Sequence, residues 1–219
     1  ADKALDLAQS VEAKVADDLA SISGVDLVLV AVSDDQTAEV CNALPAELLV
    51  AHTSGMTHLD DISRERKASF YPLQTLSKDN HVDFSNVPFC IEASSEGDCQ
   101  LLEKLAGTLT KSVRRIESDQ RQALHLAAVF ASNFVNHLYG TSQQIVEDAG
   151  LDFAILKPLI QEVAAKIQDL SPSDAQTGPA RRQDIDTLNR HLDMLLEDPP
   201  NHELYHVLTD RIMNKYHGQ

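Results

Sequence analysis

Short apolar runs closed by polar turns alternate with amphipathic segments over the first half of the chain. The run at 26–32, DLVLVAV, is rich in valine and ends at SDD, a pattern typical of a parallel strand that is buried on both faces. Further strands are predicted at 48–54, 67–72, 87–93 and 112–116, and helices at 2–14, 35–44 and 96–109. Strands that alternate with helices predict an α/β domain with a parallel sheet.

The second half of the chain is predicted to be entirely helical. From Ser118 the sequence continues without proline to Gly150, which predicts one long helix that is capped at the serine and ends at the glycine. More helices are predicted at 152–170, 181–198 and 201–217. We therefore place a domain boundary near residue 117, so that residues 1–117 form the α/β domain and residues 118–219 form a helical domain.

A polar stripe is predicted along the long helix. At about 100° per residue, a set of polar side chains falls close to one line: Ser118, Arg121, His125, Ser132, Asn136 and Gln143. The rest of the circumference is mainly Ala, Leu, Val and Phe, so we expect the helix to be buried and its polar groups to be hydrogen-bonded. Their partners could be other side chains, or a substrate that lies between the helix and the strand ends.

Composition and charge narrow the classes of function. The chain has 18 basic and 34 acidic residues and a net charge of −16, which argues against non-specific binding to nucleic acid or to an anionic membrane. No apolar run approaches the ~20 residues that span a bilayer, and the first residues lack the pattern of a secretory signal, so we expect a cytoplasmic protein. The histidines and cysteines show no spacing typical of metal ligands, so no metal site is expected.

Five motifs together show a family resemblance. They are AHTSG (51–55), FYPLQTLSK (70–78), PFCIEASSE (88–96), LHLAAVFASNFVNHLY (124–139) and AQTGPARRQD (175–184). In this order they resemble an uncharacterised group of bacterial Rossmann-like proteins, described as NADP-dependent oxidoreductases and similar in layout to pyrroline-5-carboxylate reductase. The resemblance covers nearly the whole chain.

The resemblance implies both an architecture and an activity. The expected fold is a Rossmann-like α/β domain followed by an all-helical dimerisation domain, similar to the C-terminal domain of 6-phosphogluconate dehydrogenase. The expected activity is that of an NAD(P)-dependent oxidoreductase, which transfers a hydride between nicotinamide and a small C=O or C=N substrate. The implied cofactor is NADP or NAD, and the implied partners are a second copy of the chain and a small-molecule substrate.

The sequence departs from this family at its start. Family members begin with a strand, a glycine loop, a helix and a second strand, whereas GxGxxG occurs nowhere in this sequence. We therefore expect an incomplete Rossmann-like domain that lacks roughly 35–45 residues of a normal member, a length estimated from one strand–helix–strand unit. Because the pyrophosphate sits on that loop, we expect impaired cofactor binding in a truncated chain. The alternative is a non-catalytic dimeric binding or scaffold protein that has lost dinucleotide binding.

The cofactor-binding candidates follow the first two predicted strands, at the edge where open α/β sheets bind ligands. They are Ser33 and Asp34 after the first strand, and His52, Thr53, Ser54 and Gly55 after the second. In related reductases the first turn borders the adenosine half of the cofactor and the second borders the nicotinamide. The alternative is that these polar residues only form turns and helix caps.

The catalytic candidates are placed on the long helix by resemblance. In hydroxy-acid dehydrogenases and ketopantoate reductase, the corresponding helix often carries a proton-donating lysine followed by an asparagine. His125 stands roughly where that lysine would be, with Asn133 and Asn136 downstream. Histidine can transfer protons near neutral pH, although a single histidine on a buried helix is also a common core residue.

The substrate- or anion-binding candidates come from several segments: Gln74, Ser132, Thr177, Arg181 and Arg182. The two arginines follow a Gly-Pro break in QTGPARR. They could form a fork for a carboxylate or phosphate, or they could pair with surface acids such as Asp184 or Asp186.

Overall fold

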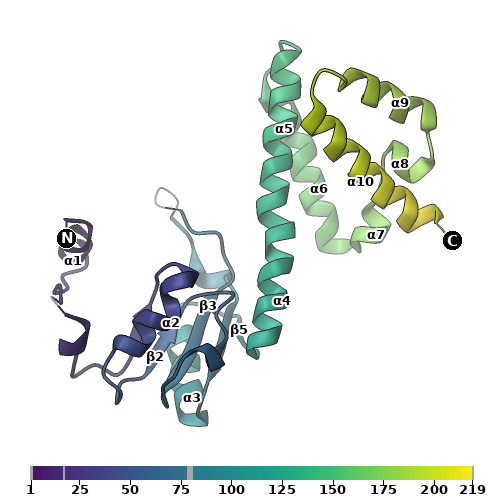
Figure 1. Ribbon diagram of the computed structural model, residues 1–219. Helices are drawn as coiled ribbons and strands as arrows, with labels where there is room; N and C mark the ends of the chain where they lie inside the picture. Colours follow the sequence, from purple (N-terminus) through teal and green to yellow (C-terminus); the bar gives the residue numbers. More distant parts are fainter. Residues whose placement is uncertain (1, 17, 78–80, 219) are drawn as a thin grey trace. The chain divides into compact units, whose positions relative to one another are not determined.

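The structure is a computed structural model that describes residues 2–16, 18–77 and 81–218 (Figure 1). Its internal contacts form two units, one that ends at Val135 and one that begins at Asn136. This division falls inside the long helix, and not near residue 117 where the pattern change placed the boundary. The first turns of that helix are bonded to the α/β domain, as described below for the candidate site.

The first unit contains a five-stranded sheet in the order β1-β2-β3-β4-β5. Its strands are β1 (Val28–Val30), β2 (Val50–His52), β3 (Lys67–Pro72), β4 (Phe89–Ala93) and β5 (Val113–Arg115). The five predicted strands and the α/β class are confirmed. The pairs β1–β2, β2–β3 and β4–β5 are parallel, as predicted, but β3 and β4 are antiparallel. The described residues between β3 and β4 contain only a 3-10 turn, η3 (Phe84–Asn86), and a parallel crossover normally needs a helix.

Helices cover both faces of this sheet. The helices before and beside it are α1 (Asp2–Ser10), α2 (Asp34–Ala43) and α3 (Glu96–Gly107), with 3-10 turns η1 (Leu19–Ser21) and η2 (Leu59–Asp61). Leu102 of α3 packs with Ala51 and Phe70 in one buried cluster, whereas Cys41 of α2 packs with Val50 in another. Neighbouring residues of a strand point to opposite faces, so α2 and α3 lie on opposite sides of the sheet.

The opening strand is less buried than its sequence predicts. β1 stands at the end of the strand order, and the Leu29 side chain in its middle is 47% exposed, whereas Val30 is 5% exposed. The prediction that this run is buried on both faces is therefore wrong for the described residues. An apolar run alone does not tell an edge strand from a central one.

The predicted long helix is present, with an irregular centre. It consists of α4 (Ser118–Ala128), a π-helical segment η4 (Val129–Phe134) and α5 (Val135–Asp148), and it is followed by Gly150 at φ 76°. The burial predicted for this helix is not completed within the chain, and its covering by a second copy stays a prediction. Leu126 is 58% exposed, Phe130 is 62% exposed and Phe134 is 48% exposed.

The regular elements among the described residues of the second unit are all helices, as predicted. After α5 come η5 (Phe153–Leu156), α6 (Lys157–Asp169), α7 (Pro172–Ala175), α8 (Pro179–Arg182), α9 (Ile185–Met194) and α10 (Pro199–His217). Helices α8, α9 and α10 contact one another, and the Tyr205 hydroxyl lies 2.7 Å from His191 Nδ1. Across the part of the chain that is described, no helix combines the length and the apolar character needed to cross a membrane.

Candidate functional site

A row of polar side chains crosses the sheet on the face that carries α2. His52 of β2, Ser69 of β3 and Glu92 of β4 are paired in register. His52 and Ser69 are fully buried. Tyr71, two residues after Ser69, points to the same face because strand side chains alternate. Of these residues, Tyr71 lines the pocket described below.

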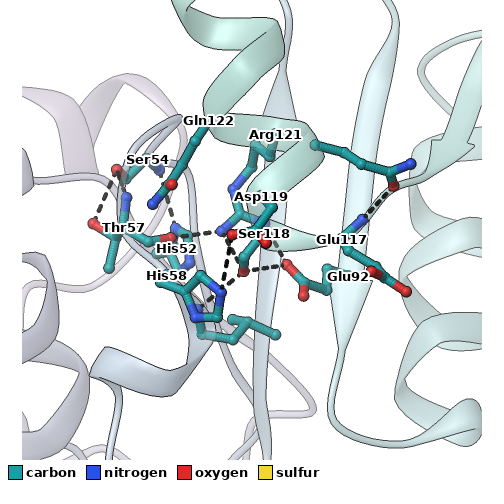
Figure 2. Close-up of polar contacts among 12 residues, drawn as sticks. His52, Ser54, Thr57, His58, Glu92, Glu117, Ser118, Asp119, Arg121 and Gln122 are labelled. Carbon is teal, nitrogen blue, oxygen red and sulfur yellow. Dashed lines mark hydrogen bonds and ion pairs between the residues drawn. The ribbon is translucent and has the colours of Figure 1, made fainter.

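A buried arginine ties the start of α4 to this row (Figure 2). Arg121 Nη1 donates to Glu92 Oε2, while Nη2 donates to the Thr57 carbonyl and to Ser118 Oγ. Ser118 Oγ donates to Glu92 at 2.7 Å and accepts the Leu59 N–H at 3.1 Å. A buried charge is costly unless it is paired, so this network fixes the first turns of α4 against the sheet.

His52 is held as a neutral imidazole. Burial, and next the positive charge of Arg121, lower the pKa of His52 from 6.5 to about 4. Its Nδ1 accepts the Ser54 N–H at 3.2 Å, so the proton of the neutral ring is on Nε2. That Nε2 is buried and has no hydrogen-bond partner among the described residues.

This lowered pKa links His52 to stability. The unfolded chain takes up a proton near pH 6.5, whereas the folded chain takes it up only near pH 4. The contribution of neutral, buried His52 to the stability of the fold is therefore fully present above about pH 6.5. It is lost as the pH falls towards 4, because protonation then favours the unfolded chain.

The turn after β2 is held by its own polar groups. The Thr53 N–H donates to the Val30 carbonyl at 3.1 Å. Ser54 Oγ accepts the N–H groups of Met56 and Thr57 at 3.0 and 2.9 Å. The Ser54 hydroxyl thus stabilises the turn itself, as expected if these polar residues only form turns and helix caps.

Gly55 in this turn lies directly beneath His125 of α4. A Cβ placed on Gly55 would lie 2.5 Å from His125 Nδ1 and 2.6 Å from its Cγ, so only glycine leaves room for the ring. On its other side, His125 Nδ1 lies 3.1 Å from the Tyr71 hydroxyl, and the two rings meet edge to face. The imidazole is therefore held between the turn after β2 and the end of β3.

A pocket of about 420 Å³ opens beside this imidazole. Its lining combines Tyr71 and His125 with polar side chains from the loop after β3 and from the π-helical segment: Gln74, Thr75, Ser132 and Asn133. Leucine, alanine and valine side chains complete the lining. A second pocket, on another side of His125, is lined by Met56, Asp119, Gln122 and Leu126 among others. The structure thus brings four candidates, His125, Gln74, Ser132 and Asn133, into one place.

Asn136 does not line either pocket beside His125. Asn136 follows the π-helical segment Val129–Phe134, belongs to the second unit and is exposed. Its role in the site stays a prediction.

Ser33 and Asp34 lie at the start of α2, after β1. Ser33 is the N-cap residue, its hydroxyl makes no capping bond within the described chain, and both residues are exposed. The pKa of Tyr71 is raised, first by burial and then by the charges of Cys90 and Asp34.

Thr177, Arg181 and Arg182 belong to the second unit. Thr177 precedes Gly178, which is the N-cap residue of α8 and has a φ of 101°. The Arg181 guanidinium lies 4.4 Å from the centre of the Tyr216 ring. The pKa of Asp184 is lowered by hydrogen bonds from Thr187 and, to a smaller extent, by the charge of Arg182.

The sequence interpretation missed several residues of this site. Tyr71 was not singled out, although its alternation with Ser69 in β3 places it on the polar face. Glu92 was not singled out either, although an acid in an otherwise apolar strand is a signal of a buried ion pair. Arg121 was predicted as part of the polar stripe, but its pairing with Glu92 was not predicted. Nowhere among the described residues do three or more His, Cys, Asp or Glu side chains gather as a metal site would require.

Comparisons with known proteins agree with this fold. The chain is 39% identical to the "putative NADP oxidoreductase BF3122" of Bacteroides fragilis, with a TM-score of 0.88 over 97% of this chain and 85% of that one. It is 25% identical to protein TM1727 of Thermotoga maritima, with a TM-score of 0.75 over 96% of this chain and 85% of that one. A "putative oxidoreductase" of Mycobacterium avium, 13% identical with a TM-score of 0.58 over 95% and 84% of the two chains, shares the fold.

No curated protein matches the chain significantly. A family model matches residues 87–212, which include β4, β5, the long helix and most of the helical unit. The chain therefore belongs to the family described as Domain of unknown function (DUF2520).

Proposed function

We propose that this protein is an NAD(P)-dependent oxidoreductase that transfers a hydride between nicotinamide and a small C=O or C=N substrate. The observation that carries the proposal is the His125 imidazole, held between Gly55 and the Tyr71 hydroxyl beside a pocket at the ends of β2 and β3. Open α/β sheets bind ligands at this edge. The name of the B. fragilis relative, an NADP oxidoreductase, supports the same chemistry.

The residues present suit the nicotinamide half of such a cofactor. Gly55 leaves a side-chain-free surface in the turn after β2, and the pocket beside it offers amide and hydroxyl groups for a carboxamide. Thr53 and Gly55 would border the ring, and Ser33 and Asp34 would border the adenosine side. When bound, the cofactor supplies or accepts the hydride.

His125 is the proposed proton donor in the reducing direction. Its Nδ1 faces Tyr71, which leaves Nε2 as the nitrogen available to a substrate. As hydride reaches the substrate carbon, Nε2–H gives its proton to the substrate oxygen or nitrogen, and the imidazole then takes up a proton from solvent. Tyr71 fixes the ring orientation, and Asn133 and Ser132 hold the polar end of the substrate. Arg121 and Glu92 act only by fixing α4.

We propose that the chain forms a homodimer through its helical residues 118–219, as the layout of pyrroline-5-carboxylate reductase suggests. Leu126, Phe130 and Phe134 present exposed apolar side chains on the long helix. Exposed apolar surface of this kind is usually covered by a partner, and a second copy is the commonest partner.

NADPH titration tests the proposed function. NADPH is titrated by calorimetry into the 219-residue chain, and we expect micromolar binding. The matched control is adenosine monophosphate, which lacks the nicotinamide and should bind more weakly. Absence of NADPH binding would overturn the proposal and favour the non-catalytic scaffold.

A further inference from the structure

The pocket beside His125 has an uncharged lining. Its polar groups are the amides of Gln74 and Asn133 and the hydroxyls of Thr75, Ser132 and Tyr71, and its other side chains apart from His125 are apolar. Among the described residues that line it, none is Lys, Arg, Asp or Glu. Amides and hydroxyls can each donate and accept, so they suit a neutral polar group.

The nearest arginine on the same helix is already committed. Arg121 is 0% exposed, and its terminal nitrogens donate to Glu92, to the Thr57 carbonyl and to Ser118. Arg121 is not among the residues that line the pocket. His125 is thus the only described lining residue that can carry a positive charge, and the proposed function uses it at the reacting C=O or C=N. An anionic group elsewhere in the pocket would lose its hydration without gaining a cation.

The surrounding charge also disfavours an anion. Asp119 lines the second pocket on another side of His125, and the net charge of the chain is −16. Both produce a negative potential that repels an incoming anion.

We propose that the substrate of this site is an uncharged molecule. It carries the reacting C=O or C=N at His125, a neutral hydrogen-bonding group against Gln74, Thr75, Ser132 and Asn133, and an apolar body against the leucine and alanine side chains. The pocket of about 420 Å³ suits a small ligand. This inference rests on the proposed function, because it assigns a substrate to the same site.

A matched pair of probes separates charge from shape. Cyclohexanecarboxamide and cyclohexanecarboxylate have nearly the same size, but only the second is charged at neutral pH. Binding of each is measured by ligand-observed NMR, with and without NADPH. We expect the amide to bind at least about tenfold more tightly than the carboxylate, since the polar groups pair with it and no cation pairs with the acid.

Two variants place a cation in the pocket. Ser132→Arg and Thr75→Arg lie on different elements, so each is an independent test, and circular dichroism checks that each variant folds. Both should reverse the preference towards the carboxylate. Gln144→Arg is the matched control, because it adds the same charge to an exposed position of the same long helix, outside the pocket lining, and should leave the preference unchanged.

The results separate this inference from the proposed function. Equal or tighter binding of the carboxylate to the unmodified protein would overturn the uncharged substrate, and so would binding of neither probe. An unchanged preference in both pocket variants would overturn it too. NADPH titration of the same samples reports on the proposed function independently, because it does not depend on either probe.

Discussion

Replacing Gly55 by alanine should displace the His125 ring. The backbone of Gly55 does not require the left-handed region, so alanine can adopt its conformation. The added Cβ, however, would lie 2.5 Å from Nδ1, 2.6 Å from Cγ and 3.0 Å from Cβ of His125. Non-bonded carbon atoms prefer about 3.5–4.0 Å, so the ring must move by roughly 1 Å and its contact with Tyr71 must change.

The cost of this overlap can be set from general magnitudes. Overpacking of a well-packed site costs about 1–3 kcal/mol. For a chain of this size, each kcal/mol lowers the melting temperature by roughly 2–4 °C. We therefore expect Gly55→Ala to lower the melting temperature by roughly 2–12 °C in a thermal scan.

A double-mutant cycle assigns the loss to His125. In a His125→Ala background the ring is gone, so Gly55→Ala should cost much less, with a coupling of about 1 kcal/mol or more. Gly97→Ala is the matched control, because a Cβ at Gly97 meets nothing within 4 Å and a helical glycine gains from the change. An equal loss from Gly55→Ala in both backgrounds would show that the imidazole does not lie over this turn.

Other predictions concern the network, the pH dependence and assembly. Glu92→Gln should cost about 3–5 kcal/mol in urea unfolding because it leaves the buried Arg121 charge unpaired, whereas Glu103→Gln, in a surface pair, should cost less than ~1 kcal/mol; equal costs would contradict the network. His52→Asn keeps a hydrogen-bond acceptor for the turn but does not titrate. Between pH 6.5 and 4 the variant should therefore lose less stability than the unmodified chain, by a difference on the order of 3 kcal/mol. Parallel curves of stability against pH would refute this. Light scattering should give twice the 24.0 kDa chain mass, and Phe130→Glu should shift it towards the monomer; an unmodified chain that is monomeric at micromolar concentration would rule out the dimer.

Most elements could be predicted because their signals are local. The five strands and the long helix follow from short-range periodicity and from breaks such as Gly150. The antiparallel β3–β4 pair could not be predicted in the same way, because strand direction depends on the connection and not on the strand sequence. The exposure of Leu29 was missed for a similar reason, since it depends on the position of β1 in the sheet.

The candidate site was only partly predictable. His125 could be singled out on the helix, but its contact with Tyr71 joins residues 54 positions apart, and that of Arg121 with Thr57 joins residues 64 apart. The role of Gly55 depends on the close approach of His125 from α4, which no local sequence pattern shows. The π-helical segment Val129–Phe134 could not be predicted either, because the sequence around it has the pattern of an ordinary helix.

The most direct test of the proposed reaction centre is the side-chain ¹⁵N NMR spectrum of the nine histidines during NADPH titration. The His125 signals are assigned with the variant His125→Asn, and no substrate is required. If the nicotinamide lies between Gly55 and the pocket, the His125 nitrogens should shift and saturate at the same NADPH concentration as the calorimetric binding curve. Saturated NADPH binding without any change in the His125 signals would contradict this placement.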